Sequence, residues 1–137
     1  ARTYIYTTAA PPAVAHALRK SLELIGGGEG ERRRRHLQVL IAALRESLAT
    51  ALAGRAWRLA PSDTAIQPLI VGANADAMAL AAALQAQDLW VPAIRPPTVP
   101  AGSARLRITL SAAHTLDDVD RLVEALVRAA CVVGSLG

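Results

Sequence analysis

The residues best suited to chemistry in this chain are arginines and a threonine gathered around one proline-rich turn. The turn reads Ile94-Arg95-Pro96-Pro97-Thr98-Val99-Pro100, and the apolar run 105–110 that follows carries Arg105 and Arg107. A cation within an apolar strand is costly unless it meets an anion. Guanidinium groups bind carboxylates and phosphates through paired hydrogen bonds. The pattern therefore predicts a bound anion, which belongs either to the protein or to a substrate.

The spacing of the two arginines predicts that they share one face of a strand. Residues two apart on a strand point the same way, so Arg105 and Arg107 are expected opposite the aliphatic side chains of the run. Both arginines could pair with acids on a solvent-facing surface. Alternatively, one of them turns into a cleft and holds a carboxylate. The prolines around Thr98 restrict the loop, which suits either accurate presentation of its hydroxyl or a plain rigid connector.

Two further segments could bind phosphate, although each has a plainer interpretation. Thr7 and Thr8 precede Pro11-Pro12 and an expected helix, and hydroxyls and free amides before a helix can bind phosphate or simply cap it. The run 32–35 is four arginines at an expected helix start, where cations oppose the helix dipole. A solvated, slightly unfavourable helix start is the simpler explanation for that run.

The remaining reactive side chains are expected to be structural. His16 and His36 are expected at the surface of helices, and His114 is expected to make a structural hydrogen bond just before a helix. Lys20 is the only lysine and is expected to be solvated, while Cys131, without a neighbouring activating group, is expected to be buried. The sequence has no Cys/His cluster, no G-x-S-x-G elbow and no phosphate-loop motif. Taken alone, it does not predict a complete enzyme.

Composition points to one domain, or a piece of a larger protein, with an aliphatic core. The chain has 137 residues, 53% hydrophobic but only 3% aromatic, and a net charge of +4. Without aromatic residues among the basic ones, this charge is weak support for nucleic-acid binding. The single cysteine excludes an internal disulfide. No signal peptide or membrane-length apolar run is visible, so a soluble, cytoplasmic protein is expected.

Hydrophobic periodicity predicts an α+β fold. From Ala65 onward the expected order is β-α-β-β-α, with helices on one face of a short, mainly antiparallel sheet. Pro68 suggests an edge or irregular strand position, Asn74 is expected to cap a helix, and Thr115 to Asp118 resemble a capping box. The expected elements are a strand at 4–8, a helix from Pro12 to Ile25, a flexible glycine linker at 26–30, a helix at about 31–53, strands at 65–71, 89–94 and 105–110, and helices at 74–87 and from 116.

Three long segments resemble the α-oxoamine synthases, which are fold-type I enzymes that use pyridoxal 5'-phosphate. The segments are Tyr4-Ile5-Tyr6-Thr7-Thr8-Ala9-Ala10-Pro11-Pro12, Ile66-Gln67-Pro68-Leu69-Ile70-Val71-Gly72, and the stretch from Ala93 to Thr115. The Ile94-Arg95-Pro96-Pro97 form favours the biotin-pathway branch. That branch joins L-alanine to a pimeloyl thioester of coenzyme A or an acyl carrier protein, loses carbon dioxide and yields 8-amino-7-oxononanoate.

The resemblance also assigns expected roles. It implies that Arg107 binds the α-carboxylate of the amino acid, that Thr98 contacts substrate, and that Thr8, with Thr7, reaches the cofactor phosphate of the partner subunit in a homodimer. Arg95, which has no counterpart in glycine-using relatives, is expected to help position the pimeloyl group. The lysine that binds the cofactor covalently would lie outside this chain, since Lys20 does not match its motif.

The chain accordingly resembles the C-terminal third of such an enzyme. Residues 1–30 are expected to be the tail of the large domain with a connecting helix, and residues 31–137 the small C-terminal domain. Asp88 stands where relatives usually have glycine, at a helix end that often needs a left-handed residue. The alternatives are a related synthase that uses glycine, or a stand-alone, non-catalytic binding module.

Overall fold

The computed structural model describes residues 11–133, so the expected strand at Tyr4 to Thr8 lies outside the described residues. The chain divides into two compact units, Ala1–Arg35 and His36–Gly137. No helix within residues 11–133 combines the length and the apolar character needed to cross a membrane. The same residues contain no group of three or more side chains arranged to hold a metal ion.

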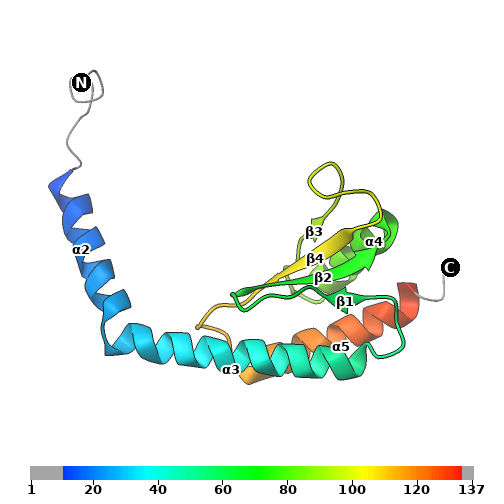
Figure 1. The fold of residues 1–137 in the computed structure, drawn as a ribbon, viewed down its shortest axis with the longest axis horizontal. Helices are drawn as coiled ribbons and strands as arrows, with labels where there is room; N and C mark the ends of the chain where they lie inside the picture. The colour runs from blue at the N-terminus through cyan, green and yellow to red at the C-terminus, as the bar shows by residue number, and fades with distance from the viewer. Residues whose placement is uncertain (1–10, 134–137) are drawn as a thin grey trace, which may run out of the picture. The chain divides into compact units, whose positions relative to one another are not determined.

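The first unit contains helix α2 (Pro12–Gly26) and the start of helix α3 (Gly28–Ala51) (Figure 1). Pro12 lies in the first turn of α2, where its missing N–H costs nothing. The expected flexible glycine linker is wrong, because Gly27 alone separates the two helices. Gly30 lies within α3, and a Cβ there would overlap the Ile25 carbonyl. These glycines thus allow a tight helix junction.

Acids at the start of α3 correct the expectation of an unfavourable basic helix end. Because α3 begins at Gly28, its first turn holds Glu29 and Glu31, which complement the helix dipole. Glu29 pairs with Arg32 and Arg33, and Glu31 pairs with Arg34 and Arg35. These arginine bonds lower the pKa of both carboxyl groups. Each of the four arginines therefore has a carboxylate partner, and the run is explained as a paired, solvated helix start without a phosphate ligand.

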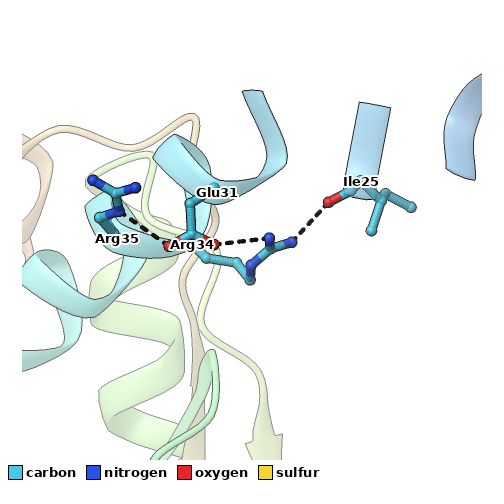
Figure 2. A network of polar contacts seen from close by, with 4 residues as sticks. All are labelled: Ile25, Glu31, Arg34 and Arg35. Atoms are coloured by element: carbon cyan, nitrogen blue, oxygen red, sulfur yellow. Dashed lines mark hydrogen bonds and ion pairs between the residues drawn. The ribbon is translucent and has the colours of Figure 1, made fainter. Parts of the chain in front are cut away.

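Arg34 also joins the two helices of this unit. Its guanidinium donates one hydrogen bond to the Ile25 carbonyl at 2.8 Å and another to Glu31 at 3.0 Å, as Figure 2 shows. Ile25 lies in the last turn of α2, where carbonyl groups lack helical partners. A cation at a helix C-terminus is favourable for the same reason. One basic residue of the run thus has a structural role at the helix junction.

The second unit is the expected α+β layer. Its sheet has the order β1-β2-β4-β3, and each neighbouring pair is antiparallel. The order β-α-β-β-α from residue 65 onward is confirmed, although the expected strand at 89–94 is reduced to two residues and β1 was not anticipated. The elements are β1 (Arg58–Leu59), β2 (Ile66–Gly72), α4 (Asn74–Gln85), β3 (Ala93–Ile94), β4 (Ala104–Thr109) and α5 (Leu116–Val133).

Helices cover only one face of this sheet. On β4 the side chains of Ala104, Leu106 and Ile108 are buried, while those between them are half-buried or exposed. The buried side chains of β2, α4, α5 and the later part of α3 belong to the same core cluster. The opposite sheet face is left without a helix among the described residues of this unit. That open face displays the arginines of β4.

Helix ends in this unit agree with the sequence in two places and differ in one. Thr115 and Asp118 form the expected capping box, with the Thr115 N–H 2.8 Å from the Asp118 carboxylate and the Asp118 N–H 3.2 Å from the Thr115 hydroxyl. Asp88 has φ 60°, the left-handed conformation expected there. Ala73, not Asn74, is the N-cap of α4, and it makes no side-chain capping bond.

Candidate functional site

The open face of the sheet combines aliphatic and cationic side chains. Paired residues of neighbouring strands point to the same face. One row across the sheet therefore contains Arg58, Ile70, Arg105 and Ile94, in that order. Arg107 lies in the adjacent row of β4. The strands contain no aspartate or glutamate, so their own residues offer these cations no carboxylate.

Arg107 lies opposite Pro68 in the centre of the sheet. The Pro68 carbonyl accepts the Ala60 N–H at 2.9 Å on one side, and the Arg107 N–H donates to the Pro92 carbonyl at 2.9 Å on the other. Pro68 and Arg107 are therefore a pair without mutual hydrogen bonds, the type in which Cα atoms approach most closely. The Pro68 ring and the Arg107 stem thus lie side by side on the open face.

This pairing also corrects the expectation that Pro68 marks an edge strand. Strand β2 lies between β1 and β4. The nitrogen of Pro68 faces the same side as its carbonyl, just beyond the two-residue strand β1, so no ladder bond to β4 is lost. An inner strand can therefore tolerate proline here.

The two arginines of β4 differ in their surroundings. Arg105 is half-buried, and its Nε–H donates to the Ser103 carbonyl at 3.1 Å. The Arg107 side chain is exposed and makes no hydrogen bond or ion pair with any described residue. An unpaired guanidinium on a partly apolar face can form a bidentate pair with an incoming carboxylate. Arg107 is therefore the better candidate of the two.

Arg95 and Thr98 lie in the loop that joins β3 to β4, beyond the end of the sheet (Figure 1). Both are exposed, and the Thr98 N–H donates to the Arg95 carbonyl at 3.1 Å, which closes a tight turn. The Pro96–Pro97 peptide bond in this turn is cis. This loop leads directly into β4, which carries Arg107, so one β-hairpin carries all three of these candidate residues. Thr7 and Thr8 lie outside the described residues.

The other reactive side chains have local structural roles. Lys20 is solvated, as expected, and pairs with Glu23 on α2. His16 and His36 are exposed, as expected, and His36 Nε2 lies 2.9 Å from the His114 carbonyl. His114 Nδ1 accepts the Ser111 N–H at 3.1 Å, so the structural hydrogen bond expected of His114 is confirmed.

Cys131 corrects another expectation, because it is exposed rather than buried. The preceding residues Ala129 and Ala130 occupy the core-facing side of α5. The next residue along a helix is rotated by about 100°, and this rotation moves Cys131 outward. Its sulfur lies 3.8 Å from an Arg55 nitrogen.

A buried polar network behind the candidate face was not anticipated from the sequence. Gln67 on β2 is fully buried, and its side-chain carbonyl accepts a hydrogen bond from Arg45 on α3 at 2.6 Å. Its amide donates to the Thr64 carbonyl at 2.6 Å and to the Ser62 carbonyl at 3.3 Å. The sequence signal was a glutamine at a core position of a strand, immediately before Pro68.

Comparison with known proteins gives a consistent result. The family model described as aminotransferase class I and II matches residues 1–126. The chain is 70% identical over 132 residues to an 8-amino-7-oxononanoate synthase of Polaromonas naphthalenivorans, covering 94% of this chain and 32% of that protein. A protein of the same name from Leptothrix cholodnii is 71% identical over 133 residues, with coverage of 95% and 33%. The chain thus spans about a third of the length of these relatives.

Solved structures show the same fold. A serine palmitoyltransferase of Sphingomonas wittichii matches with a TM-score of 0.82 and 28% identity, over 98% of this chain and 33% of that one. A high-resolution structure of SPT with PLP matches with a TM-score of 0.82 and 27% identity, over 97% of this chain and 32% of that one. An 8-amino-7-oxononanoate synthase of Francisella tularensis matches with a TM-score of 0.76 and 25% identity, over 96% of this chain and 36% of that one. The open sheet therefore belongs to a fold shared with much longer enzymes.

Proposed function

Because this chain belongs to the aminotransferase class I and II family, we propose that it is the C-terminal third of an 8-amino-7-oxononanoate synthase. The whole enzyme would condense L-alanine with a pimeloyl thioester and release carbon dioxide. The observation that carries the proposal is Arg107, a guanidinium without a described partner on an open, partly apolar sheet face, combined with the 70% identity to a protein of that name.

Arg107 would bind the α-carboxylate of L-alanine. Two parallel N–H···O bonds fix the plane of a carboxylate as well as its position. With the carboxylate fixed, the bonds from Cα to hydrogen and to the carboxyl carbon take defined directions, which is the positioning that C–H and C–C cleavage both need. The Pro68 ring restricts the arginine stem, and aliphatic neighbours such as Ile70 reduce competition from water.

Thr98 and Arg95 would act from the β3–β4 loop. A threonine hydroxyl can both donate and accept a hydrogen bond, so Thr98 suits contact with the amino acid near Arg107. Arg95 would position the pimeloyl part of the thioester, whose free end is a carboxylate. An Arg95→Ala enzyme should show a higher KM for the pimeloyl thioester, and an unchanged KM would contradict this role.

Pyridoxal 5'-phosphate would be the cofactor, and its ring would act as the electron sink for the reaction. The described residues fit the substrate side of such a site, since they include a candidate carboxylate-binding arginine, and their one lysine, Lys20, lies exposed on α2 and does not match the motif of the covalent lysine. Lys20 is paired with Glu23 on α2. The covalent lysine would therefore belong to the rest of the enzyme. Thr8 and Thr7 would contact the cofactor phosphate of the partner subunit in a homodimer.

The proposal includes a division of the chain. Residues 1–30 would be the tail of the large domain with a connecting helix, and residues 31–137 the small domain. Exposed apolar side chains on α2 support this division, because a larger domain would cover them. They are Val14, Leu18, Leu22, Leu24 and Ile25.

Product analysis of the full-length enzyme that contains this chain tests the proposal. Purified enzyme with pyridoxal phosphate is given L-alanine, glycine or L-serine, each with pimeloyl-CoA or pimeloyl acyl carrier protein. We expect 8-amino-7-oxononanoate and carbon dioxide from L-alanine only. A preference for glycine would instead identify a related synthase, and no condensation with any pair would point to a binding module. The thioester that is accepted identifies the natural donor.

A further inference from the structure

The buried network behind the candidate face joins three parts of the second unit. Arg45 of α3 donates from one nitrogen to the Gln67 side-chain carbonyl at 2.6 Å and to the Ala60 carbonyl at 3.2 Å. Gln67 in turn donates to the carbonyls of Thr64 and Ser62. Among the described residues Arg45 has no carboxylate partner. A half-buried cation that is satisfied only by amide and carbonyl oxygens requires accurate placement of each of them.

The loop between β1 and β2 is held from within as well. The Ser62 hydroxyl donates to the Ile66 carbonyl at 2.7 Å, and the Ile66 N–H donates to the Thr64 hydroxyl at 3.2 Å. This loop also reaches the candidate face, because the Ala60 N–H donates to the Pro68 carbonyl. The network therefore fixes β2 on both sides of Gln67.

We propose that Arg45 and Gln67 are positioning residues for Arg107. Gln67 points into the core and its neighbour Pro68 points to the open face, beside Arg107. A shift of β2 at Gln67 would move the Pro68 ring and the strand against which Arg107 is placed. The inference rests on the proposed role of Arg107 in binding the amino-acid carboxylate.

The test measures L-alanine binding to the full-length holoenzyme through the change in cofactor absorbance. Gln67→Met removes every hydrogen bond of the amide with little change in side-chain length. We expect the Kd for L-alanine to rise about 5- to 10-fold, since small misplacements of a binding group are costly. The KM for the pimeloyl thioester should not change. Arg45→Met should cause a similar rise, and the double variant should be no worse than either single one.

Val71→Ala is the matched control. Val71 is a buried residue of the same strand, but it lies at the irregular pairing near Gly72, away from the Pro68–Arg107 pair. The Val71→Ala substitution should lower Tm without changing the Kd for L-alanine. If Gln67→Met also lowers Tm but leaves that Kd unchanged, the network is merely structural and the inference is wrong.

Two further variants keep the outcomes distinct. If Gln67→Met does not fold, Gln67→Glu provides the test. Its carboxylate still accepts the Arg45 hydrogen bond, but it no longer donates to the carbonyls of Thr64 and Ser62. An unchanged Kd for L-alanine in this variant would also overturn the inference. Arg107→Ala separates the two proposals. Unchanged L-alanine binding in Arg107→Ala would refute the proposed role of Arg107, whereas weakened binding there with normal binding in the Gln67 variants would refute only the positioning role.

Discussion

At the residue scale, the central feature is a guanidinium whose environment favours an external anion. Arg107 lies on a strand with no acidic residues, beside the Pro68 ring, and makes no polar contact with a described side chain. Its neighbour Arg105 is half-buried and bonded to the Ser103 carbonyl. Two identical side chains on one strand are thus separated by their contacts, which sequence spacing alone could not provide.

Substitution of Arg107 should selectively weaken binding of the amino acid. Loss of a bidentate, charge-assisted pair reduces the binding free energy by about 3 kcal/mol, which is roughly 100-fold in affinity. We therefore expect Arg107→Ala to raise the Kd for L-alanine by about that factor in the full-length enzyme, measured by titration of cofactor absorbance. Arg105→Ala is the control and should leave this Kd nearly unchanged. Equal effects of the two substitutions would refute the distinction between them.

Asp88 allows a test of local backbone strain. Its φ of 60° lies in the left-handed region, which costs side chains energy but is free for glycine. Asp88→Gly should raise the stability of the enzyme by about 0.5–1 kcal/mol, observed as a higher Tm. Ala82→Gly in the middle of α4 should lower stability by about 1 kcal/mol. A lower Tm for Asp88→Gly would show that the aspartate makes a compensating interaction.

At the element scale, helix ends and junctions determine how the secondary structure is placed. The glycine-rich segment is a tight junction of α2 with α3 rather than a linker, because Arg34 bonds the Ile25 carbonyl and Gly30 leaves room for that carbonyl. The capping box of α5 and the left-handed end after α4 follow local rules that residue type reveals. The core-facing sides of α3 and α5 follow hydrophobic periodicity, whereas α2 has no buried residue.

Gly30 and Gly26 form a matched pair for testing the junction. A Cβ at Gly30 would overlap the Ile25 backbone, whereas one at Gly26 has nothing within 4 Å. Gly30→Ala should therefore lower the free energy of unfolding by about 1–3 kcal/mol. Gly26→Ala should leave it unchanged or raise it slightly. Thermal unfolding and limited proteolysis near residue 27 of the full-length enzyme would measure both. Equal tolerance of the two substitutions would contradict a close helix junction.

The capping box predicts a pH dependence. Hydrogen bonds from the backbone and side chain of Thr115 lower the pKa of Asp118 below its ordinary value of 3.8. A depressed pKa means that the ionised carboxylate stabilises the fold above that ordinary value, and this stabilisation is lost as pH falls through the lower folded-state pKa. Asp118→Asn should thus lower Tm at pH 7, and the difference from the unsubstituted enzyme should shrink toward pH 3. A constant difference would exclude a contribution from the charge.

At the scale of the whole molecule, the chain is about a third of the length of its named relatives. The described residues contain a carboxylate-binding candidate and a single lysine, Lys20, which lies exposed on α2 and pairs with Glu23, and α2 also exposes apolar side chains. Both observations are accounted for if the remaining polypeptide supplies the cofactor side of the site and covers that helix. The domain boundary at residue 30 stays a prediction.

The 137-residue chain alone should be inactive. Purified chain with added pyridoxal phosphate, L-alanine and a pimeloyl thioester should form no 8-amino-7-oxononanoate, because the proposed division of the site assigns only the carboxylate-binding arginine, and not the cofactor lysine, to this chain. Mass-spectrometric product detection is the measurement, and the full-length enzyme is the positive control. Turnover by the isolated chain would refute the proposed division of the site.

The sequence by itself determined the α+β class, the order of elements from residue 65, the capping box of α5 and the family, because these depend on periodicity, turn chemistry and long matching motifs. It misjudged Pro68, Cys131 and the glycine segment, because each depends on what lies across space: a short neighbouring strand, the rotation of α5, and the close approach of two helices. Only the tertiary structure showed that Arg105 bonds the Ser103 carbonyl while Arg107 has no described partner, and that Arg45 bonds Gln67. Such contacts arise from pairings between distant segments, which no local pattern encodes.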